Sequence, residues 1–133
     1  MRSVGGALFK DGKLLVAKRI GSRKVWPNLW EIPGGRLESG ENDEQAIMRE
    51  FLEETELKVK PLKKYTTIFY DYAGEHCQEA HYIITSESFE VKIDPNEHSE
   101  FRWVYLKESE CLPMAAEMRT SVRLAFAYFA ECD

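Results

Sequence analysis

One segment, residues 42–57, constrains the fold more than any other, because it combines an uninterrupted helical pattern with a dense group of carboxylates. Asn42 is of a residue type that caps helices, and Gln45 stands three positions later, where a capping box needs its second partner. No glycine or proline interrupts the segment, and its apolar residues follow helical rather than alternating spacing. The sequence therefore predicts a helix over about 43–56, preceded by a turn at Pro33-Gly34-Gly35.

Three glutamates, Glu50, Glu53 and Glu54, share one face of this helix, because they stand at positions i, i+3 and i+4. Like charges at this spacing repel by about 0.2–0.5 kcal/mol per pair on an exposed helix, so a solvated acidic surface is one interpretation. The other interpretation is a cation site, since carboxylates are hard oxygen donors and nearby glycines let backbone carbonyls approach an ion. With no histidine or cysteine among the donors, such a site would suit Mg²⁺ or Mn²⁺ rather than Zn²⁺.

The remainder of the chain predicts several strands and one more helix. An Asp-Gly hairpin signal and runs of β-branched and aromatic residues indicate strands at residues 4–9, 14–17, 30–32, 65–72, 81–85 and 101–106. Apolar residues at helical spacing predict a core-facing helix over 115–130. Strands interleaved with two helices indicate an α/β protein in which helices pack on a mixed sheet, and residues 1–133 form a single expected domain.

Composition and charge exclude some classes of function. With a formal net charge of −5, the chain shows no basic footprint for a nucleic acid polymer or an anionic membrane. No stretch approaches membrane-spanning length, and the first residues lack the apolar core of a signal peptide. Cys77, Cys111 and Cys132 form no CxxC pair, which is typical of reduced thiols in a core or on a surface. We therefore expect a cytoplasmic protein.

Residues 35–57, GRLESGENDEQAIMREFLEETEL, resemble the Nudix box. A chance match of its charged and glycine positions would arise at far below about 10⁻⁵ per start position. Phe51 replaces a usual aliphatic residue, and Glu56 stands where the box has glycine; a non-glycine residue in the left-handed conformation there costs roughly 1 kcal/mol. The matching residues are Gly35, Glu41, Arg49, Glu50, Glu53, Glu54 and Leu57. Residues 15–19, 26–35 and 97–104 also resemble segments of the family.

The resemblance implies an α/β/α sandwich of the Nudix type and metal-dependent cleavage of a phosphoanhydride bond in a nucleoside diphosphate derivative. It implies that Glu50, Glu53 and Glu54 ligate divalent ions, Mg²⁺ or Mn²⁺, helped by the backbone carbonyl of Gly34 or Gly35. Arg49 would orient the glutamates through charge-assisted hydrogen bonds, and Glu41 would hold Arg49.

Other site roles have open alternatives. Glu50 is the first candidate for the general base, with Glu97 and Glu100 as alternatives, each of which could instead be a solvated loop residue. Arg19, Lys18 and Arg23 could neutralise distal phosphates or could be ordinary surface charges. The three histidines, without partner spacing, are expected to be structural or exposed. Trp26, Trp30 and Tyr82 are core candidates, and one of them could stack on a base instead.

The family resemblance favours a nucleoside triphosphate as the substrate, cleaved to a monophosphate and pyrophosphate. Residues 112–116 resemble the late segment of the MutT-type members, although Ala116 stands where some of these carry an asparagine that reads oxidised guanine. Ala73 stands where ADP-ribose-cleaving members often carry proline, which argues against that branch. Alternatives are ADP-ribose, nucleotide sugars, dinucleoside polyphosphates, a non-catalytic nucleotide-binding regulator and a diphosphate isomerase. A homodimer is a further expectation, since small domains of this kind often pair.

Overall fold

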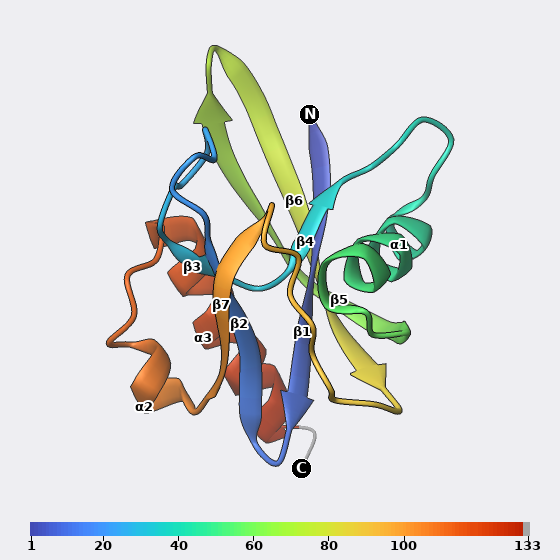
Figure 1. The fold of residues 1–133 in the computed structure, drawn as a ribbon, viewed down its shortest axis with the longest axis vertical. Coiled ribbons are helices and arrows are strands. Elements are labelled where there is room, and N and C mark those ends of the chain that lie inside the picture. Colours follow the sequence, from blue (N-terminus) through green and yellow to red (C-terminus); the bar gives the residue numbers. More distant parts are fainter. Residues whose placement is uncertain (132–133) are drawn as a thin grey trace.

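A seven-stranded mixed sheet forms the centre of the protein (Figure 1). The computed structural model describes residues 1–131. The main path of the sheet is β3-β2-β1-β6-β5, while β4 pairs with β1 and β7 pairs with β2. Strands β1 and β6 run parallel, and the other described pairs are antiparallel. The strands are β1 (Arg2–Lys10), β2 (Lys13–Arg19), β3 (Trp30–Glu31), β4 (Gly34–Arg36), β5 (Val59–Tyr72), β6 (Glu75–Ser86) and β7 (His98–Val104).

Helices lie on both faces of the sheet and bury two separate apolar cores. Helix α1 (Asp43–Thr55) covers one core through Ile47 and Phe51, and α3 (Ala116–Glu131) covers the other through Met118 and Val122. These four side chains are at most 1% exposed, so the predicted core-facing stripe of the last helix is confirmed. Figure 1 shows α1 and α3 on different sides of the central strands, and the predicted α/β/α sandwich is therefore confirmed.

Helix α1 begins and ends as its sequence predicts. The side chain of Asn42 accepts a hydrogen bond from the backbone N–H of Gln45, and the Gln45 side chain accepts one from the Asn42 backbone N–H. At the other end Glu56 adopts the left-handed conformation, with φ 59° and ψ 19°. The glutamate therefore takes the conformation that a glycine would take more easily.

The glycine pair before the helix is a strand rather than the predicted turn. Gly34 and Gly35 belong to β4 and pair with Gly5 and Val4 of β1. A Cβ atom on Gly34 would overlap the carbonyl oxygen of Val4, so the two backbones approach more closely than any other residue would allow. The prediction of a turn was wrong because a Pro-Gly-Gly run marks close backbone approach as readily as a change of direction.

The predicted Asp-Gly hairpin is confirmed, and the long strands β5 and β6 form a second hairpin. Asp11 and Gly12 have φ of 52° and 79°, as a tight turn between β1 and β2 requires. Ala73 and Gly74, with φ of 51° and 79°, connect β5 to β6 in the same way. Strand β5 begins well before the predicted residue 65 and passes Pro61 with a shift in register. Helix α2 (Leu106–Ser109) was not predicted, because a single turn has no periodicity to detect.

Cysteine placement agrees with reduced thiols in two of the three cases. Cys77 is buried, Cys111 is exposed, and both are free. Cys132 lies outside the described residues. No helix within residues 1–131 combines the length and the apolar character needed to cross a membrane.

Candidate active site

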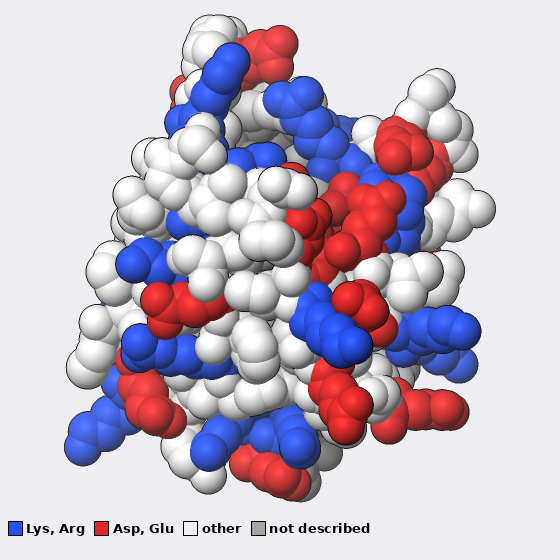
Figure 2. All heavy atoms as spheres, viewed as in Figure 1, with Lys and Arg blue, Asp and Glu red and all other residues white. Residues whose placement is uncertain are grey.

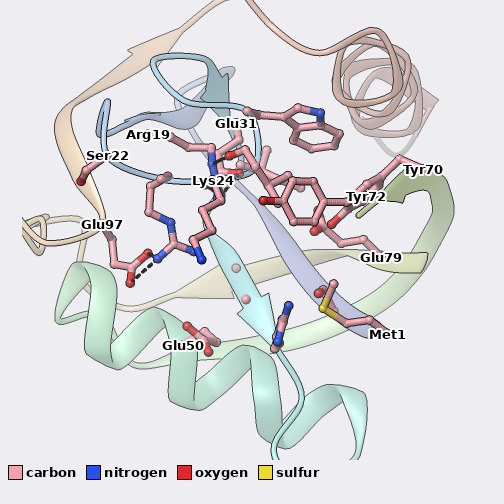
Figure 3. A pocket seen from close by; sticks show the side chains of 18 residues that line it. Met1, Arg19, Ser22, Lys24, Glu31, Glu50, Tyr70, Tyr72, Glu79 and Glu97 are labelled. Atoms are coloured by element: carbon pink, nitrogen blue, oxygen red, sulfur yellow. Dashed lines mark hydrogen bonds and ion pairs between the residues drawn. The ribbon is translucent and has the colours of Figure 1, made fainter. Parts of the chain in front are cut away.

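A pocket of about 560 Å³ lies between α1, β4 and the loop after β2, with the β5–β6 hairpin on its far side. Figure 3 shows Glu50 and Glu97 on one side of this pocket and Tyr70, Tyr72 and Glu79 on the other. We call the first side the acidic end and the second the aromatic end. From outside, acidic side chains gather in a hollow beside α1, bordered by lysines and arginines (Figure 2).

Arg49 organises the acidic end through its whole guanidinium group. Its Nε and Nη2 donate to the two carboxylate oxygens of Glu41 at 2.7 and 2.8 Å, and Nη2 also donates to the backbone oxygen of Arg36. Its Nη1 donates to Glu50 at 2.8 Å and to Glu53 at 3.3 Å. The hydrogen bonds from Arg49 lower the pKa of Glu41 to about 2. The arrangement that the family resemblance implies for Arg49 and Glu41 is therefore present in the structure.

The carboxylate of Glu50 packs directly against Gly35 of β4, which we call the glycine strand. A Cβ atom on Gly35 would come within 2.6 Å of both carboxylate oxygens of Glu50, so only glycine leaves room for this carboxylate. Burial raises the pKa of Glu50, although hydrogen bonds from Glu54 and Arg49 oppose the shift. The side chain is 15% exposed and faces the pocket. A carboxylate held in this way can bind a cation or accept a proton.

Glu54 is almost completely buried behind Glu50. The residue is 3% exposed, and its Oε2 has no hydrogen-bond partner among the described residues. Its Oε1 lies 3.5 Å from Nδ1 of His98, whose Nε2 donates to Glu31 at 2.9 Å. Burial raises the pKa of Glu54 well above its usual value, and the carboxyls of Glu50 and Glu31 add to the shift. Burial acts in the same direction on Glu31, but hydrogen bonds from His98 and the charge of Arg19 leave its pKa lowered.

These residues fit a hard divalent cation. An unpaired carboxylate oxygen in a buried position is costly, and a bound cation is one of the few groups that can satisfy it. The available donors are carboxylate and carbonyl oxygens from Glu50, Glu54 and the glycine strand, which suit magnesium-like ions. Glu53 is 56% exposed in its side chain and points outward towards Arg49. Within residues 1–131, no three acidic, histidine or cysteine side chains form a closed metal cage, so backbone or solvent oxygens would complete the coordination.

The predicted basic residues are divided between the pocket and the surface. Arg19 lines the pocket, but its Nη1 is bound to Glu31 and its Nε to the backbone oxygen of Val25. Arg23 also lines it and lies 2.9 Å from Glu97. Lys24, which the sequence did not single out, lines the pocket and forms no ion pair within residues 1–131.

Lys18 and Glu100 are not among the residues that line this pocket. The two residues are register partners on β2 and β7, and Glu100 lies 3.3 Å from Arg102. The structure therefore brings Glu97, and not Glu100, to the acidic end.

The aromatic end was missed by sequence analysis apart from Trp26. Its indole packs on Tyr70 with ring centroids 4.6 Å apart, and Tyr72 and Glu79 complete this side of the pocket. Trp30 is 4% exposed, so its assignment to the core is confirmed. The strand pattern of the β5–β6 hairpin could not reveal which of its aromatic side chains face the pocket, because that depends on the twist of a long hairpin.

The histidines have structural or exposed positions, as expected. His81 and His98 are at most 1% exposed, and each is hydrogen-bonded to a glutamate that lines the pocket. His76 is exposed and lies 2.6 Å from Asp71. The two buried histidines therefore position site carboxylates, which is a role that sequence spacing could not reveal.

Comparison with known proteins defines the class of protein that this fold and site represent. The family model described as the NUDIX domain matches residues 1–125. The nucleoside triphosphatase NudI of Escherichia coli O139:H28 (strain E24377A) is 32% identical over 127 residues, which cover 86% of this chain and 88% of that protein. The 8-oxo-dGTP diphosphatase of Proteus vulgaris is 36% identical over 56 residues, which cover 42% of this chain and 50% of that protein.

Among solved structures, the MutT protein of Methanosarcina mazei Go1 superposes with a TM-score of 0.85 at 21% identity, covering 98% of this chain and 93% of that one. The chain belongs to the Nudix hydrolase family and is a pyrophosphohydrolase that acts on phosphoanhydride bonds. Members of this family typically use a divalent metal ion, and the family implies a nucleotide substrate.

Proposed function

We propose that this protein hydrolyses a nucleoside triphosphate to the monophosphate and pyrophosphate, with Mg²⁺ or Mn²⁺ as the cofactor. The observation that carries the proposal is the buried carboxyl of Glu54, which has an unpartnered oxygen and lies directly behind Glu50 at the acidic end. The pocket adds basic side chains for phosphates and an aromatic wall for a nucleoside. The relative named as a nucleoside triphosphatase, similar over most of both chains, supports this substrate class.

The acidic end supplies the residues that would hold the cation. Glu50, Glu54 and the backbone carbonyl of Gly34 or Gly35 would hold the cation, and Glu53 would have to turn from its exposed position to join them. When bound, the cation screens the polyphosphate and lowers the pKa of the attacking water. Arg49 is a positioning residue. Its guanidinium group donates a hydrogen bond to Glu50 and is itself held by two hydrogen bonds to the carboxylate of Glu41.

The chemical step needs a base for the attacking water and positive charge for the leaving group. Glu50 is the first candidate for the base, because it lies in the pocket with a raised pKa. Glu97 is the alternative, and its ion pair with Arg23 would have to open first. Glu100 ranks behind both, because it pairs with Arg102 outside the pocket. Arg23 and Lys24 are placed to balance the charge of the leaving pyrophosphate, while Arg19 mainly holds Glu31.

The experiment that tests this proposal is a product assay over a panel of nucleotides, with Mg²⁺ or with EDTA. The panel contains NTPs, dNTPs, their oxidised forms, ADP-ribose, nucleotide sugars and dinucleoside polyphosphates. We expect metal-dependent release of pyrophosphate from at least one triphosphate. Release of AMP from ADP-ribose alone, or silence across the panel from folded protein, would contradict the proposal. Glu44→Gln, which removes an exposed charge on α1 away from the pocket, is the control for nonspecific effects of charge.

A further inference from the structure

A buried chain of hydrogen bonds ends at the aromatic end of the pocket. The hydroxyl of Tyr65 lies 2.8 Å from Oγ of Ser121, which lies 2.5 Å from Nδ1 of His81. Nε2 of His81 in turn lies 2.6 Å from Oε2 of Glu79. His81 and Ser121 are both 0% exposed, and Glu79 lines the pocket. Two buried side chains, from β6 and α3, and the partly buried Tyr65 of β5 therefore support one carboxylate that substrate can reach.

The chemistry of the groups fixes the direction of the hydrogen bond to Glu79. An ionised carboxylate only accepts hydrogen bonds, so Nε2 of His81 carries the proton and donates to Glu79. The hydroxyl of Ser121 lies between Nδ1 of His81 and the hydroxyl of Tyr65, and it can both donate and accept a hydrogen bond. Burial raises the pKa of Tyr65, so its hydroxyl stays protonated and can donate. Glu79 is thus held as an acceptor in a fixed rotamer.

Both oxygens of Glu79 can still accept from a ligand, because His81 uses only one of the two lone pairs on Oε2. Oε2 is bound to His81, while Oε1 has no hydrogen bond within the described part of the chain. The side chain is 13% exposed, and that exposed part faces the pocket. Figure 3 shows Glu79 next to Tyr72 and Tyr70, and away from Glu50. A nucleotide whose phosphates lie at the acidic end would therefore bring its base to Glu79.

We propose that Glu79 is the residue that reads the base, and that it selects a base with two adjacent N–H donors, the edge of guanine. This inference rests on the proposed function for the placement of the phosphates. Guanine presents N1–H and the 2-amino group side by side, and a carboxylate can accept both at once. Cytosine and adenine place a ring nitrogen acceptor beside their amino group, and uracil flanks its single N–H with two carbonyls. A fixed carboxylate repels each of these acceptors.

Tyr70 and Trp26 add affinity without selecting among bases, because every base has a π-face that can stack on an aromatic ring. The Watson–Crick edge of 8-oxoguanine carries the same two donors as guanine. Glu79 therefore accepts both forms, and any choice between them depends on contacts at the other edge of the base.

The test measures binding of nucleoside monophosphates by calorimetry in EDTA, so that it depends on neither metal nor hydrolysis. We expect GMP to bind about 10- to 100-fold more tightly than UMP, CMP or AMP. IMP, which lacks only the 2-amino group, should bind the wild-type protein about 10-fold more weakly than GMP. In Glu79→Gln the advantage of GMP over IMP should disappear, while Glu75→Gln, at the exposed start of the same strand, should retain it.

Equal affinity for GMP, IMP and UMP in the wild-type protein would overturn the inference, as would a GMP preference that survives in a folded Glu79→Gln variant. Because the comparison of GMP with IMP uses the wild-type protein, it decides the question even if the variant does not fold. A clear GMP preference together with no hydrolysis of any triphosphate would leave the inference standing and remove the proposed function. 8-oxo-GMP binding as tightly as GMP supports selection by this edge, because both bases present the same two donors there.

Discussion

At each end of the pocket a buried histidine positions a glutamate, but the two ends are assembled from very different stretches of sequence. At the acidic end, buried His98 bridges Glu31 and Glu54, and at the aromatic end buried His81 bridges Glu79 and Ser121. The glutamates proposed to bind the metal all come from one helix, α1, and the strand before it, β4, brings the glycine backbone beside them. The second end combines the loop after β2 with β5, β6 and α3. The residues proposed for the chemistry lie close together in the sequence, whereas the aromatic end, which is proposed to bind the base, is assembled by contacts between distant segments.

The largest effect that would separate the two ends is expected from Glu50→Gln. The amide keeps the shape of the side chain but cannot take the water's proton and is a weaker ligand for a cation, so kcat should fall by about 10²- to 10⁴-fold. Binding of GMP in EDTA should stay unchanged, because the base lies at the other end. Steady-state kinetics and calorimetry on one preparation measure both. Retention of most activity would remove Glu50 as ligand and as base together.

Gly34→Ala should damage the acidic end through the backbone. The added methyl group overlaps the carbonyl oxygen of Val4, so β4 must move away from β1, at a cost of about 1–3 kcal/mol in the free energy of unfolding. Urea denaturation measures this loss. Gly40→Ala is not a suitable control, because Gly40 has φ of 84°, so Gly21→Ala, in the loop after β2, serves instead. Equal stability of the two variants would contradict the close approach.

Tyr70→Ala should weaken the aromatic end and spare the chemistry. Loss of base stacking corresponds to about 1–3 kcal/mol, so KM should rise roughly 10-fold or more with little change in kcat. Phe69→Ala is the matched control, because Phe69 is the neighbouring residue and 67% exposed. A fall in kcat with KM unchanged would show that Tyr70 acts at the acidic end instead.

The acidic end should also make the stability of the metal-free protein depend on pH. The pKa of Glu54 is raised in the folded state, so above about pH 4.5 the unfolded chain loses this proton first and stability falls as pH rises. The slope from this one proton is at most about 1.4 kcal/mol per pH unit. Glu41 has the opposite effect, in a lower pH range. Because its pKa is lowered to about 2 in the folded protein, it stabilises the fold above about pH 4.5, and this stabilisation is lost as the pH falls towards 2.

Thermal unfolding in EDTA between pH 5 and 8 measures this slope, and Glu54→Gln should flatten it. Saturating Mg²⁺ should restore stability at the higher pH values, since the cation favours the ionised carboxylate. A slope that is the same in Glu54→Gln would assign the effect to other groups.

The smallest effect concerns neither end of the pocket. Glu56→Gly should stabilise the protein by up to about 1 kcal/mol, because glycine adopts the left-handed conformation at the end of α1 without strain. Chemical denaturation measures the change, and kcat should stay unchanged. Leu57 follows at 1% exposed, so any shift of this turn would instead destabilise the core and reverse the sign.

Much of the acidic end could be predicted because it depends on short-range geometry. The spacing of Glu50 and Glu54 on a helix, the capping box at Asn42 and the bond from Arg49 to Glu41 all lie within one short segment. The Pro-Gly-Gly run was misassigned as a turn, because its strand pairing with β1 involves residues about thirty positions away. Lys18 and Glu100 were candidates because residues 15–19 and 97–104 resemble family segments, but neither residue lines the pocket, and the two are register partners on β2 and β7.

The sequence by itself determined the family, the packing of helices on a mixed sheet and the carboxylates of the acidic end. These features follow from helix periodicity and motif spacing, which can be read from a few neighbouring residues. Only the tertiary structure decided that Glu54 is buried beside His98, that Arg19 is committed to Glu31, and that Glu79 reaches the aromatic end. The physical reason is that burial, strand register and hairpin twist depend on contacts between segments far apart in the chain. Those contacts arrange ordinary glutamates into one pocket with an acidic end and an aromatic end.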